Sequence, residues 1–460
     1  MMSWLGNHVA RATGGRRSLR CRLGSTLVAT PLEENFAAHM SLGKSHTHVV
    51  WKDGHKSKFL NAWLRDHCQC SSCFDKTTAQ RSSDTLAIGD ASNIRSTEAH
   101  TSNQQLSLSL EYGNGKSHTC SFPLDWLRSN CYSPAGKEER RQEQHQNSFL
   151  WDPTRLTQLC IENNETTKET TDLLYGLPVT PHEMLPQFPG VLRSQLHRYG
   201  IAFVSHVKIP EQYEGDSNVN VVEQCKTIVE TTVRDYLGFP RETLWGTLWD
   251  TAPSHDAPDT AYTNIALRPH VDCTYLRDPP ELQIFLCAEE SDDHNGGSST
   301  FLDGFHVAMA MYKKSPEAFH FFATTRLGFQ CIQDGVHSVA YGTVFEIDPS
   351  ICQRSPTPLD VVRFRYNNDD RSVINFLDAN DVEMFYHYVP LLLELLRDEQ
   401  FVLRTRLQKG TMAIVNNHRV LHGRESFEGT GRNLVGCYAE LSEAVLPNAV
   451  RPTPPPNNQL

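Results

Sequence analysis

Residues 267–275 contain the short motif on which the fold assignment rests, Leu267-Arg268-Pro269-His270-Val271-Asp272-Cys273-Thr274-Tyr275. His270 and Asp272 are two positions apart, and residues i and i+2 of an extended strand point to the same face of a sheet. An imidazole beside a carboxylate supplies two of the three ligands in the 2-His-1-carboxylate arrangement that binds non-haem Fe(II). A solvated His–Asp pair has the same spacing, so the assignment depends on the surrounding sequence.

The third metal ligand and a co-substrate anchor are expected near the end of the chain. His422, in Val420-Leu421-His422-Gly423-Arg424, is the candidate for the third ligand. Arg432 follows at a distance typical of a hairpin. Its guanidinium can bind the carboxylate of an organic co-substrate through two parallel hydrogen bonds.

Composition and charge limit the classes of function. The chain has 460 residues, 39% of them hydrophobic, and a formal net charge of −11. The negative charge argues against nucleic acid as the main partner. We expect no membrane-spanning segment, because no run of about 18 apolar residues occurs.

The first 32 residues differ in charge from the rest of the chain. Residues 1–32 contain no Asp or Glu but several arginines among Ser, Ala, Leu and Gly. This composition predicts a mitochondrial presequence, and the alternative is a disordered basic tail. Since the segment lacks the apolar core of a secretory signal, we expect the 13 cysteines to be reduced.

Residues 45–132 are predicted to form a small N-terminal β domain, with Lys58–Leu64 as one of its strands. Cys68, Cys70 and Cys73 place three thiols on one tight loop, which is typical of a structural zinc site. The fourth ligand is expected to be His118, with Cys120 and His67 as competitors. The alternative is a cluster of free thiols.

The rest of the chain is predicted to hold one large catalytic domain. Residues 133–187 are polar and are interpreted as a linker or insertion, and residues 447–460 as a disordered tail. Between them, residues 188–446 alternate short strand patterns with a few helical stretches. This order favours a mostly β fold, an antiparallel double-stranded β-helix (jelly roll) with helical insertions.

An aromatic cluster precedes the His-x-Asp motif. Trp245, Trp249 and Tyr262 could bring three rings together on neighbouring strands. Such rings form cages for quaternary ammonium groups, because a diffuse positive charge is attracted to π-faces. Ordinary core packing of aromatic residues is the alternative.

Taken together, the motifs resemble the γ-butyrobetaine/trimethyllysine dioxygenase family. The matching segments follow the family's order: Trp63–Cys70 in the N-terminal zinc domain, then Trp245–Trp249, Asp259–Thr263, His270–Tyr275, Gly296–Ser299, Leu302–Phe305, Arg365–Asn368 and Leu421–Glu425. The resemblance extends from about residue 48 to residue 445, apart from the insertion. It implies an Fe(II)- and 2-oxoglutarate-dependent dioxygenase that uses O2 and ascorbate, carries a structural zinc ion and forms a homodimer.

The resemblance also implies roles for individual residues. His270, Asp272 and His422 match the iron ligands, and Arg432 and Ser299 match residues that contact 2-oxoglutarate. The other matches are the trimethylammonium cage (Trp245, Trp249, Tyr262 and Tyr438), a residue at the other end of the substrate (Asn367) and the zinc ligands (Cys68, Cys70, Cys73 and His118). Trp245 and Cys273 stand where family members carry another aromatic residue and a threonine.

Two substrates are compatible with this family. Asp259 stands where the butyrobetaine type has asparagine, and its carboxylate could pair with the α-ammonium of trimethyllysine, although it could also only cap a turn. We therefore predict C3 hydroxylation of Nε-trimethyllysine, the first step of carnitine biosynthesis, in the mitochondrial matrix. The alternatives are γ-butyrobetaine hydroxylation and, more distantly, a non-catalytic zinc-containing interaction protein.

Overall fold

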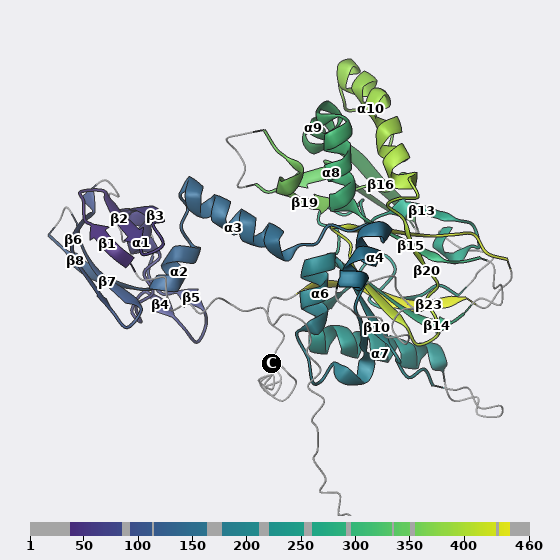
Figure 1. Ribbon diagram of the computed structural model, residues 1–460, viewed down its shortest axis with the longest axis horizontal. Coiled ribbons are helices and arrows are strands. Elements are labelled where there is room, and N and C mark those ends of the chain that lie inside the picture. Colours follow the sequence, from purple (N-terminus) through teal and green to yellow (C-terminus); the bar gives the residue numbers. More distant parts are fainter. Residues whose placement is uncertain are drawn as a thin grey trace, which may run out of the picture. The chain divides into compact units, whose positions relative to one another are not determined.

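The protein was analysed as a computed structural model that describes residues 37–84, 93–112, 115–162, 177–210, 220–252, 260–290, 296–333, 335–349, 355–428 and 432–441. The chain divides into two compact units between Gln142 and Glu143 (Figure 1). The predicted presequence (residues 1–32) and tail (447–460) lie outside the described residues. None of the described helices is long and apolar enough to cross a membrane.

The first unit is built mainly from short antiparallel strands. Its sheets have the orders β1-β2-β3, β6-β7-β8 and β4-β5. The strands are β1 (Ala37–Ser41), β2 (His46–Trp51), β3 (Lys56–Leu60), β4 (Phe74–Asp75), β5 (Gln80–Arg81), β6 (Arg95–Ser102), β7 (Gln105–Glu111) and β8 (Ser117–Pro123), and the helices are α1 (Asn61–Asp66) and α2 (Leu124–Ser129). Trp51, Phe59, Leu108 and Phe122 are fully buried in one core, so this unit has a hydrophobic core of its own.

The strand predicted over Lys58–Leu64 is wrong in its second half, where α1 begins. The side-chain amide of Asn61 donates to the carbonyls of Gly43 and Ile94, both at 3.0 Å, and its oxygen accepts from Thr47 at 2.8 Å. These buried bonds hold Asn61 at the point where the β3 ladder stops. The chain then turns into a helix that buries Ala62 and Leu64.

The second unit contains two facing sheets and the helices that cover them. A seven-stranded sheet has the order β11-β23-β14-β21-β10-β9, with β12 beside β23, and a four-stranded sheet has the order β13-β22-β15-β20. The strands of these two sheets are β9 (Val179–Pro181), β10 (Ile201–Ser205), β11 (Gly238–Arg241), β12 (Trp249–Asp250), β13 (Leu267–His270), β14 (Leu282–Glu289), β15 (Ser299–Asp303), β20 (Leu403–Thr405), β21 (Met412–Asn416), β22 (Val420–Arg424) and β23 (Asn433–Leu441). The predicted jelly-roll catalytic domain is confirmed.

The remaining elements of the second unit are helices and two short ribbons. The helices are α4 (Pro153–Glu162), η4 (His182–Met184), α6 (Val191–Tyr199), α7 (Val221–Tyr236), η5 (Thr260–Tyr262), α8 (Gly304–Lys314), α9 (Pro316–Thr324), η6 (Pro358–Asp360) and α10 (Ala379–Arg397). The ribbons pair β16 (Leu327–Gln333) with β17 (Val336–Gly342), and β18 (Phe345–Ile347) with β19 (Val361–Phe364). Helices α8, α9 and α10 lie together in Figure 1 and share one core with the end of β22.

Apolar side chains fix the two sheets face to face. Phe203 on the seven-stranded sheet and Phe301 on the four-stranded sheet meet edge to face, with ring centroids 5.9 Å apart. On the outer face of the larger sheet, the apolar side of α7 buries Cys225, Val229 and Val233. The strands are therefore covered on both faces, which explains their nearly continuous apolar sequences.

The stretch interpreted as a linker or insertion, residues 133–187, contains regular structure. Helix α3 (Pro134–Asn147) crosses the division between the units, and α4 follows it. Trp151 is fully buried in the catalytic unit and donates from Nε1 to the carbonyl of Tyr199 at 2.6 Å. The polar composition hid this part of the unit, because only a few apolar residues of the stretch, among them Trp151, Leu156 and Leu177, enter the core.

Candidate active site

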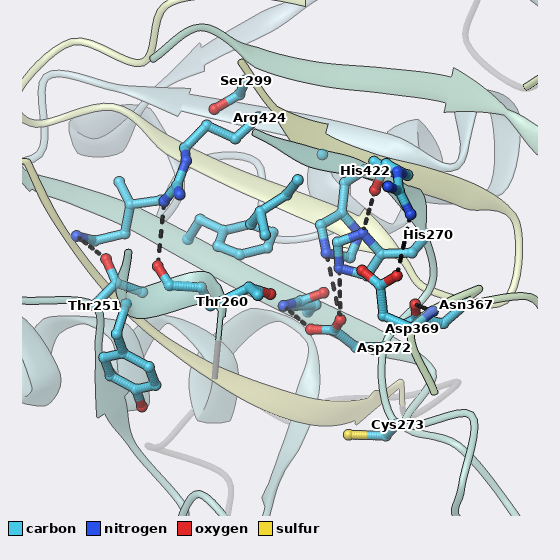
Figure 2. Close-up of a pocket in the computed structure, with 18 of the residues that line it drawn as sticks. Thr251, Thr260, His270, Asp272, Cys273, Ser299, Asn367, Asp369, His422 and Arg424 are labelled. Carbon is cyan, nitrogen blue, oxygen red and sulfur yellow. Dashed lines mark hydrogen bonds and ion pairs between the residues drawn. The ribbon is translucent and has the colours of Figure 1, made fainter. Parts of the chain in front are cut away.

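The three predicted iron ligands lie within one pocket between the two sheets. His270 on β13 and His422 on β22 are direct cross-strand partners, and Asp272 follows two residues after His270. Asp272 Oδ1 lies 3.1 Å from His270 Nε2 and 3.7 Å from His422 Nε2. One donor atom from each residue lies within 4.8 Å of the other two, as binding of a single metal ion requires (Figure 2).

Hydrogen bonds to neighbouring atoms orient two of the three ligands. The carbonyl oxygen of Arg268 lies 2.6 Å from His270 Nδ1, which donates to it, and His270 Nε2 faces Asp272 Oδ1. Asp272 Oδ2 accepts hydrogen bonds from Gln283 Nε2 and, at 2.7 Å, from the hydroxyl of Tyr438. Oδ1 therefore faces the two imidazoles. Such outer partners fix the tautomer and direction of metal ligands.

The charges of the three groups are coupled to one another. Burial by itself lowers the pKa of His270, but the hydrogen bond and charge of Asp272 raise the pKa to about 9. Burial, together with the nearby His270, lowers the pKa of His422 to about 3. Burial raises the pKa of Asp272, but His422 and His270 outweigh it and lower that pKa below its ordinary value. The ionised carboxylate is therefore compensated by the protonated His270, and a divalent metal ion supplies the same compensation when it takes the place of that proton.

A buried arginine, Arg432, and the hydroxyl group of Ser299 form a cationic wall at one end of the pocket. Arg432 lines the pocket, and its Nη2 is 3.4 Å from Ser299 Oγ, which lies on β15. Burial lowers the pKa of Arg432 to about 10, so the guanidinium remains charged at neutral pH. A buried charge without an anionic partner is costly. This arrangement therefore favours binding of a carboxylate.

Arg424, two residues after His422, holds the segment next to the pocket. Its guanidinium donates to the carbonyls of Ala261 at 3.2 Å, Thr263 and Ile265 at 2.8 Å. The 3-10 turn η5, which carries Tyr262, is thereby tied to β22, the strand of the predicted iron ligand His422.

The four predicted cage residues line the same pocket as the metal site. Their rings form two pairs: Trp245 with Tyr262, at 6.0 Å between centroids, and Trp249 with Tyr438, at 5.8 Å. Tyr438 therefore serves two contacts, one with Trp249 and one with Asp272. Gly436, the cross-strand partner of Trp249, leaves room for the indole, since a Cβ there would lie 2.5 Å from it.

The other end of the pocket carries polar groups. Asn367 lines the pocket, and its Oδ1 accepts from the backbone N–H of Asp369 at 2.9 Å. Asp259, the predicted partner of a substrate ammonium, lies outside the described residues. Cys273 adopts a left-handed backbone conformation with φ +56° directly after Asp272 and is buried.

The four predicted zinc ligands meet in the first unit. His118 Nε2 lies 3.5 Å from Cys68 Sγ, 3.6 Å from Cys70 Sγ and 3.5 Å from Cys73 Sγ. Zinc bonds of about 2.3 Å to sulfur and about 2.0 Å to nitrogen give tetrahedral N···S edges of roughly 3.5 Å, so the donor set fits Zn(II). His67, one competitor for the fourth position, lies 2.9 Å through Nδ1 from the carbonyl of Trp63. Cys120, the other, hydrogen-bonds Cys68 and lowers its pKa.

Several residues of the site were not predicted from the sequence. Gln283 was interpreted only as part of a strand, and Arg268, Asp369 and Arg424 only as neighbours of motifs. For Gln283 a signal was present, because it is the one polar side chain within the apolar run Leu282–Cys287. The pairing of Gln283 with Tyr438 across β14 and β23 depends on strand register, which the sequence does not display.

Comparisons with known proteins agree with the geometry. The family described as "Taurine catabolism dioxygenase TauD, TfdA family" matches residues 179–438, and "Gamma-butyrobetaine hydroxylase-like, N-terminal" matches residues 39–102. The mitochondrial trimethyllysine dioxygenase of Mus musculus is 30% identical over 83% of this chain and 80% of its own. The γ-butyrobetaine dioxygenase of Pseudomonas sp. is 25% identical over 86% of this chain and 91% of its own. The non-haem iron oxygenase OrfP, solved with Fe and α-ketoglutaric acid, aligns with a TM-score of 0.40 and 13% identity over 63% of this chain and 91% of its own.

The two-sheet fold and the matching family define this chain as a 2-oxoglutarate-dependent dioxygenase that uses Fe(II). Within that class, the chain belongs to the γ-butyrobetaine/trimethyllysine dioxygenase family, which the resemblance of its motifs had indicated.

Proposed function

We propose that the protein hydroxylates Nε-trimethyllysine at C3, the first step of carnitine biosynthesis. One observation carries the proposal: four aromatic rings that suit a quaternary ammonium line the same pocket as the two histidines and the carboxylate. A ring face attracts a cation within about 6 Å of its centroid. Relatives about 30% identical to this chain bear the name trimethyllysine dioxygenase.

The roles of the metal site and the cationic wall follow from their chemistry. His270, Asp272 and His422 hold Fe(II), which together with 2-oxoglutarate and O2 supplies the oxidation of a C–H bond. Arg432 and Ser299 hold the distal carboxylate of 2-oxoglutarate. Their buried guanidinium and hydroxyl group lie 3.4 Å apart, and no carboxylate of the described part of the pocket lies beside them. Ascorbate is proposed as the reductant that keeps the iron ferrous.

The substrate is oriented by its two ends. Trp245, Trp249, Tyr262 and Tyr438 surround the trimethylammonium group. Asp259 and Asn367 bind the amino-acid end, and C3 is presented to the iron between them. This orientation selects one carbon, since both ends of the substrate are fixed.

The direct experiment is turnover of 2-oxoglutarate by the purified full-length protein with Fe(II) and ascorbate. Trimethyllysine and γ-butyrobetaine are supplied separately, and products are identified by mass spectrometry. We expect one added oxygen atom on trimethyllysine, stoichiometric with succinate. Absence of that product, with iron bound, would overturn the proposal.

γ-Butyrobetaine is the second candidate substrate. It is supported by the relative from Pseudomonas sp. that bears the name γ-butyrobetaine dioxygenase and by the same ring cage. The variant Asp259→Asn separates the two, because only trimethyllysine carries an α-ammonium. We expect the variant to lose more activity on trimethyllysine than on γ-butyrobetaine; equal losses would contradict the role of Asp259.

The first unit is proposed to hold a structural zinc ion through Cys68, Cys70, Cys73 and His118. The three N···S distances match a tetrahedral site, and a closed four-ligand site stabilises a small domain without doing chemistry. We expect one zinc per chain by elemental analysis, with retention of the ion when iron is removed by a weak chelator.

The location and assembly of the protein are also proposed. The arginine-rich residues 1–32 and the mitochondrial trimethyllysine dioxygenase of Mus musculus support the mitochondrial matrix. Import of the full-length chain into isolated mitochondria, with loss of import when these arginines become glutamines, tests this proposal. A homodimer is expected from the resemblance and is tested by light scattering of the purified protein.

A further inference from the structure

Arg268 and Asp369 form an ion pair in the wall of the active-site pocket to which no role has yet been assigned. Arg268 Nη1 lies 3.4 Å from Asp369 Oδ1, and the two side chains are 62% and 55% exposed. Both residues line the pocket that contains the metal ligands. Figure 2 shows Asp369 and Asn367 next to His270, on the opposite side of the pocket from Thr251.

The backbone holds both charges at fixed positions relative to the metal site. Arg268 lies on β13 two residues before His270, and its carbonyl oxygen is the partner of His270 Nδ1. The loop that carries Asp369 is tied to the same strand end, because the N–H of Val271 donates to the carbonyl of Tyr366 at 3.0 Å.

Further bonds fix the other side of this loop. The hydroxyl of Thr274 donates to Asp370 Oδ2 at 2.6 Å, and the N–H of Gln330 donates to the Asp370 carbonyl at 2.7 Å. The pair is therefore presented by ordered backbone on both sides, whereas its charged ends remain open to the pocket. Such pre-organisation lowers the cost of binding a ligand.

The position of the reacting carbon explains why a pair of opposite charges should lie here. In trimethyllysine, C3 is bonded to C2, and C2 carries both the α-ammonium and the α-carboxylate. If C3 faces the iron, both charges of the amino-acid end must bind next to the metal ligands. The trimethylammonium group, at the far end of the side chain, reaches the aromatic rings instead.

We propose that Arg268 and Asp369 bind the α-amino-acid end of the substrate by exchanging partners with it. Arg268 takes the α-carboxylate and Asp369 takes the α-ammonium. The inference rests on the proposed trimethyllysine activity. Breaking the existing pair costs little, since an ion pair between exposed side chains contributes little to stability.

The test compares the affinities of two ligands for the anaerobic holoenzyme with Fe(II) and 2-oxoglutarate, measured by calorimetry. The ligands are trimethyllysine and the analogue in which hydrogen replaces the α-ammonium. The variants are Asp369→Asn and Arg268→Gln. Asp278→Asn is the matched control, because Asp278 is a 68% exposed partner of Arg363 and does not line the pocket.

We expect the wild type to bind trimethyllysine at least tenfold more tightly than the analogue, and Asp369→Asn to lower this preference severalfold. Arg268→Gln should lower the affinity for both ligands at least tenfold, since both retain the carboxylate. Asp278→Asn should change neither affinity. Three outcomes would overturn the inference. The wild type could bind both ligands equally, Asp369→Asn could keep the full preference for trimethyllysine, or only Asp259→Asn could remove that preference.

Turnover separates failure of this inference from failure of the proposed function. If the wild type hydroxylates trimethyllysine and the ligand preference is unaffected by Asp369→Asn, only the inference is wrong. If the wild type neither binds nor hydroxylates trimethyllysine while it consumes γ-butyrobetaine, the proposed substrate is wrong as well, and the inference falls with it.

Discussion

At the scale of single residues, Asp272 uses its two carboxylate oxygens for different contacts. Oδ1 faces His270 and His422, whereas Oδ2 accepts from Gln283 and Tyr438. The four partners come from two sheets, since His270 pairs with His422 across β13 and β22 and Gln283 pairs with Tyr438 across β14 and β23. The direction of Oδ1, the oxygen proposed to bind the metal, therefore depends on Gln283 and Tyr438, which are not among the proposed metal ligands.

Replacement of Gln283 by methionine tests this dependence. Gln283→Met keeps the side-chain volume but removes a donor to Asp272 Oδ2, so the carboxylate can rotate. We expect Fe(II) affinity to fall by about 10- to 100-fold, the usual effect of losing an outer partner of a metal ligand. Anaerobic titration calorimetry measures the change. Gln195→Met is the control, because Gln195 is equally buried but bonds to Thr180; unchanged iron affinity in Gln283→Met would contradict the role.

Arg432 is expected to determine affinity for the co-substrate and not for the metal. Truncation of one partner of a buried charge pair costs about 2–5 kcal/mol. Arg432→Met should therefore raise the KM for 2-oxoglutarate roughly 100-fold, with little change in Fe(II) affinity. Steady-state kinetics and metal titration measure the two effects. Arg193→Met is the control, because Arg193 bonds to the carbonyls of Tyr236 and Leu237 outside the pocket. If Arg432→Met lowered the Fe(II) affinity as much as it raised the KM for 2-oxoglutarate, the substitution would have disrupted the whole site.

The sequence allowed the two histidines, Asp272 and Arg432 to be singled out because short spacings and known ligand chemistry constrain them. It did not allow Gln283, Arg268 or Asp369 to be identified. Their importance comes from cross-strand register and from a loop folded against β13, and neither is encoded in local spacing. Tyr438 was assigned only to the cage, since its hydroxyl contact with Asp272 depends on the same register.

At the scale of elements, the connection between β22 and η5 determines the shape of the pocket. Arg424 on β22 donates to three carbonyls of residues 261–265, and the 3-10 turn presents Tyr262 to Trp245. A lysine cannot reproduce the planar fork of donors. Arg424→Lys should therefore loosen the turn and shift one wall of the cage.

We expect Arg424→Lys to lower kcat/KM for the trimethylammonium substrate by about 10- to 100-fold, mainly through KM, because small displacements of a bound substrate are costly. Fe(II) affinity should remain unchanged. Arg326→Lys provides the control, since Arg326 donates to the carbonyl of Tyr341 on β17 and does not line the pocket. A lower kcat with unchanged KM would contradict a positioning role.

Element assignment from sequence succeeded where periodicity was strong and failed where a side chain changed the backbone path. The short strand patterns predicted within residues 188–446 include the apolar runs of β14, β21 and β23, which are strands. The error at Lys58–Leu64 arose because the spacing of Leu60, Ala62 and Leu64 is compatible both with the two-residue period of a strand and with the 3.6-residue period of a helix. The buried amide of Asn61 selects the helix through contacts with residues distant in the sequence.

At the scale of the whole molecule, each unit has its own core and its own metal-ligand set. Structural zinc contributes about 10–16 kcal/mol to folding in small metal-binding peptides. Cys70→Ser should therefore abolish zinc binding and the thermal transition of the first unit, and leave the transition of the second unit in place. Differential scanning calorimetry with elemental analysis measures both.

Cys331→Ser is the control for this experiment, because Cys331 is a half-buried thiol on β16 in the second unit. It should leave the zinc content and the first transition unchanged. A single cooperative transition that shifts as a whole in Cys70→Ser would show that the two units do not unfold independently. The division of the chain near residue 142 lies within residues 133–187, the stretch interpreted as a linker or insertion, but polar composition alone does not give the residue at which contacts change.

The attachment of Asp272 to both sheets has an evolutionary consequence. Metal–ligand distances are tolerated within about 0.2 Å, and one carboxylate links the histidine pair on one sheet to the Gln283–Tyr438 pair on the other. Selection on iron binding therefore acts on the separation of the sheets themselves. Drift in distant packing residues, such as the contact of Phe203 with Phe301, is limited by the coordination chemistry of the metal as well as by the stability of the fold.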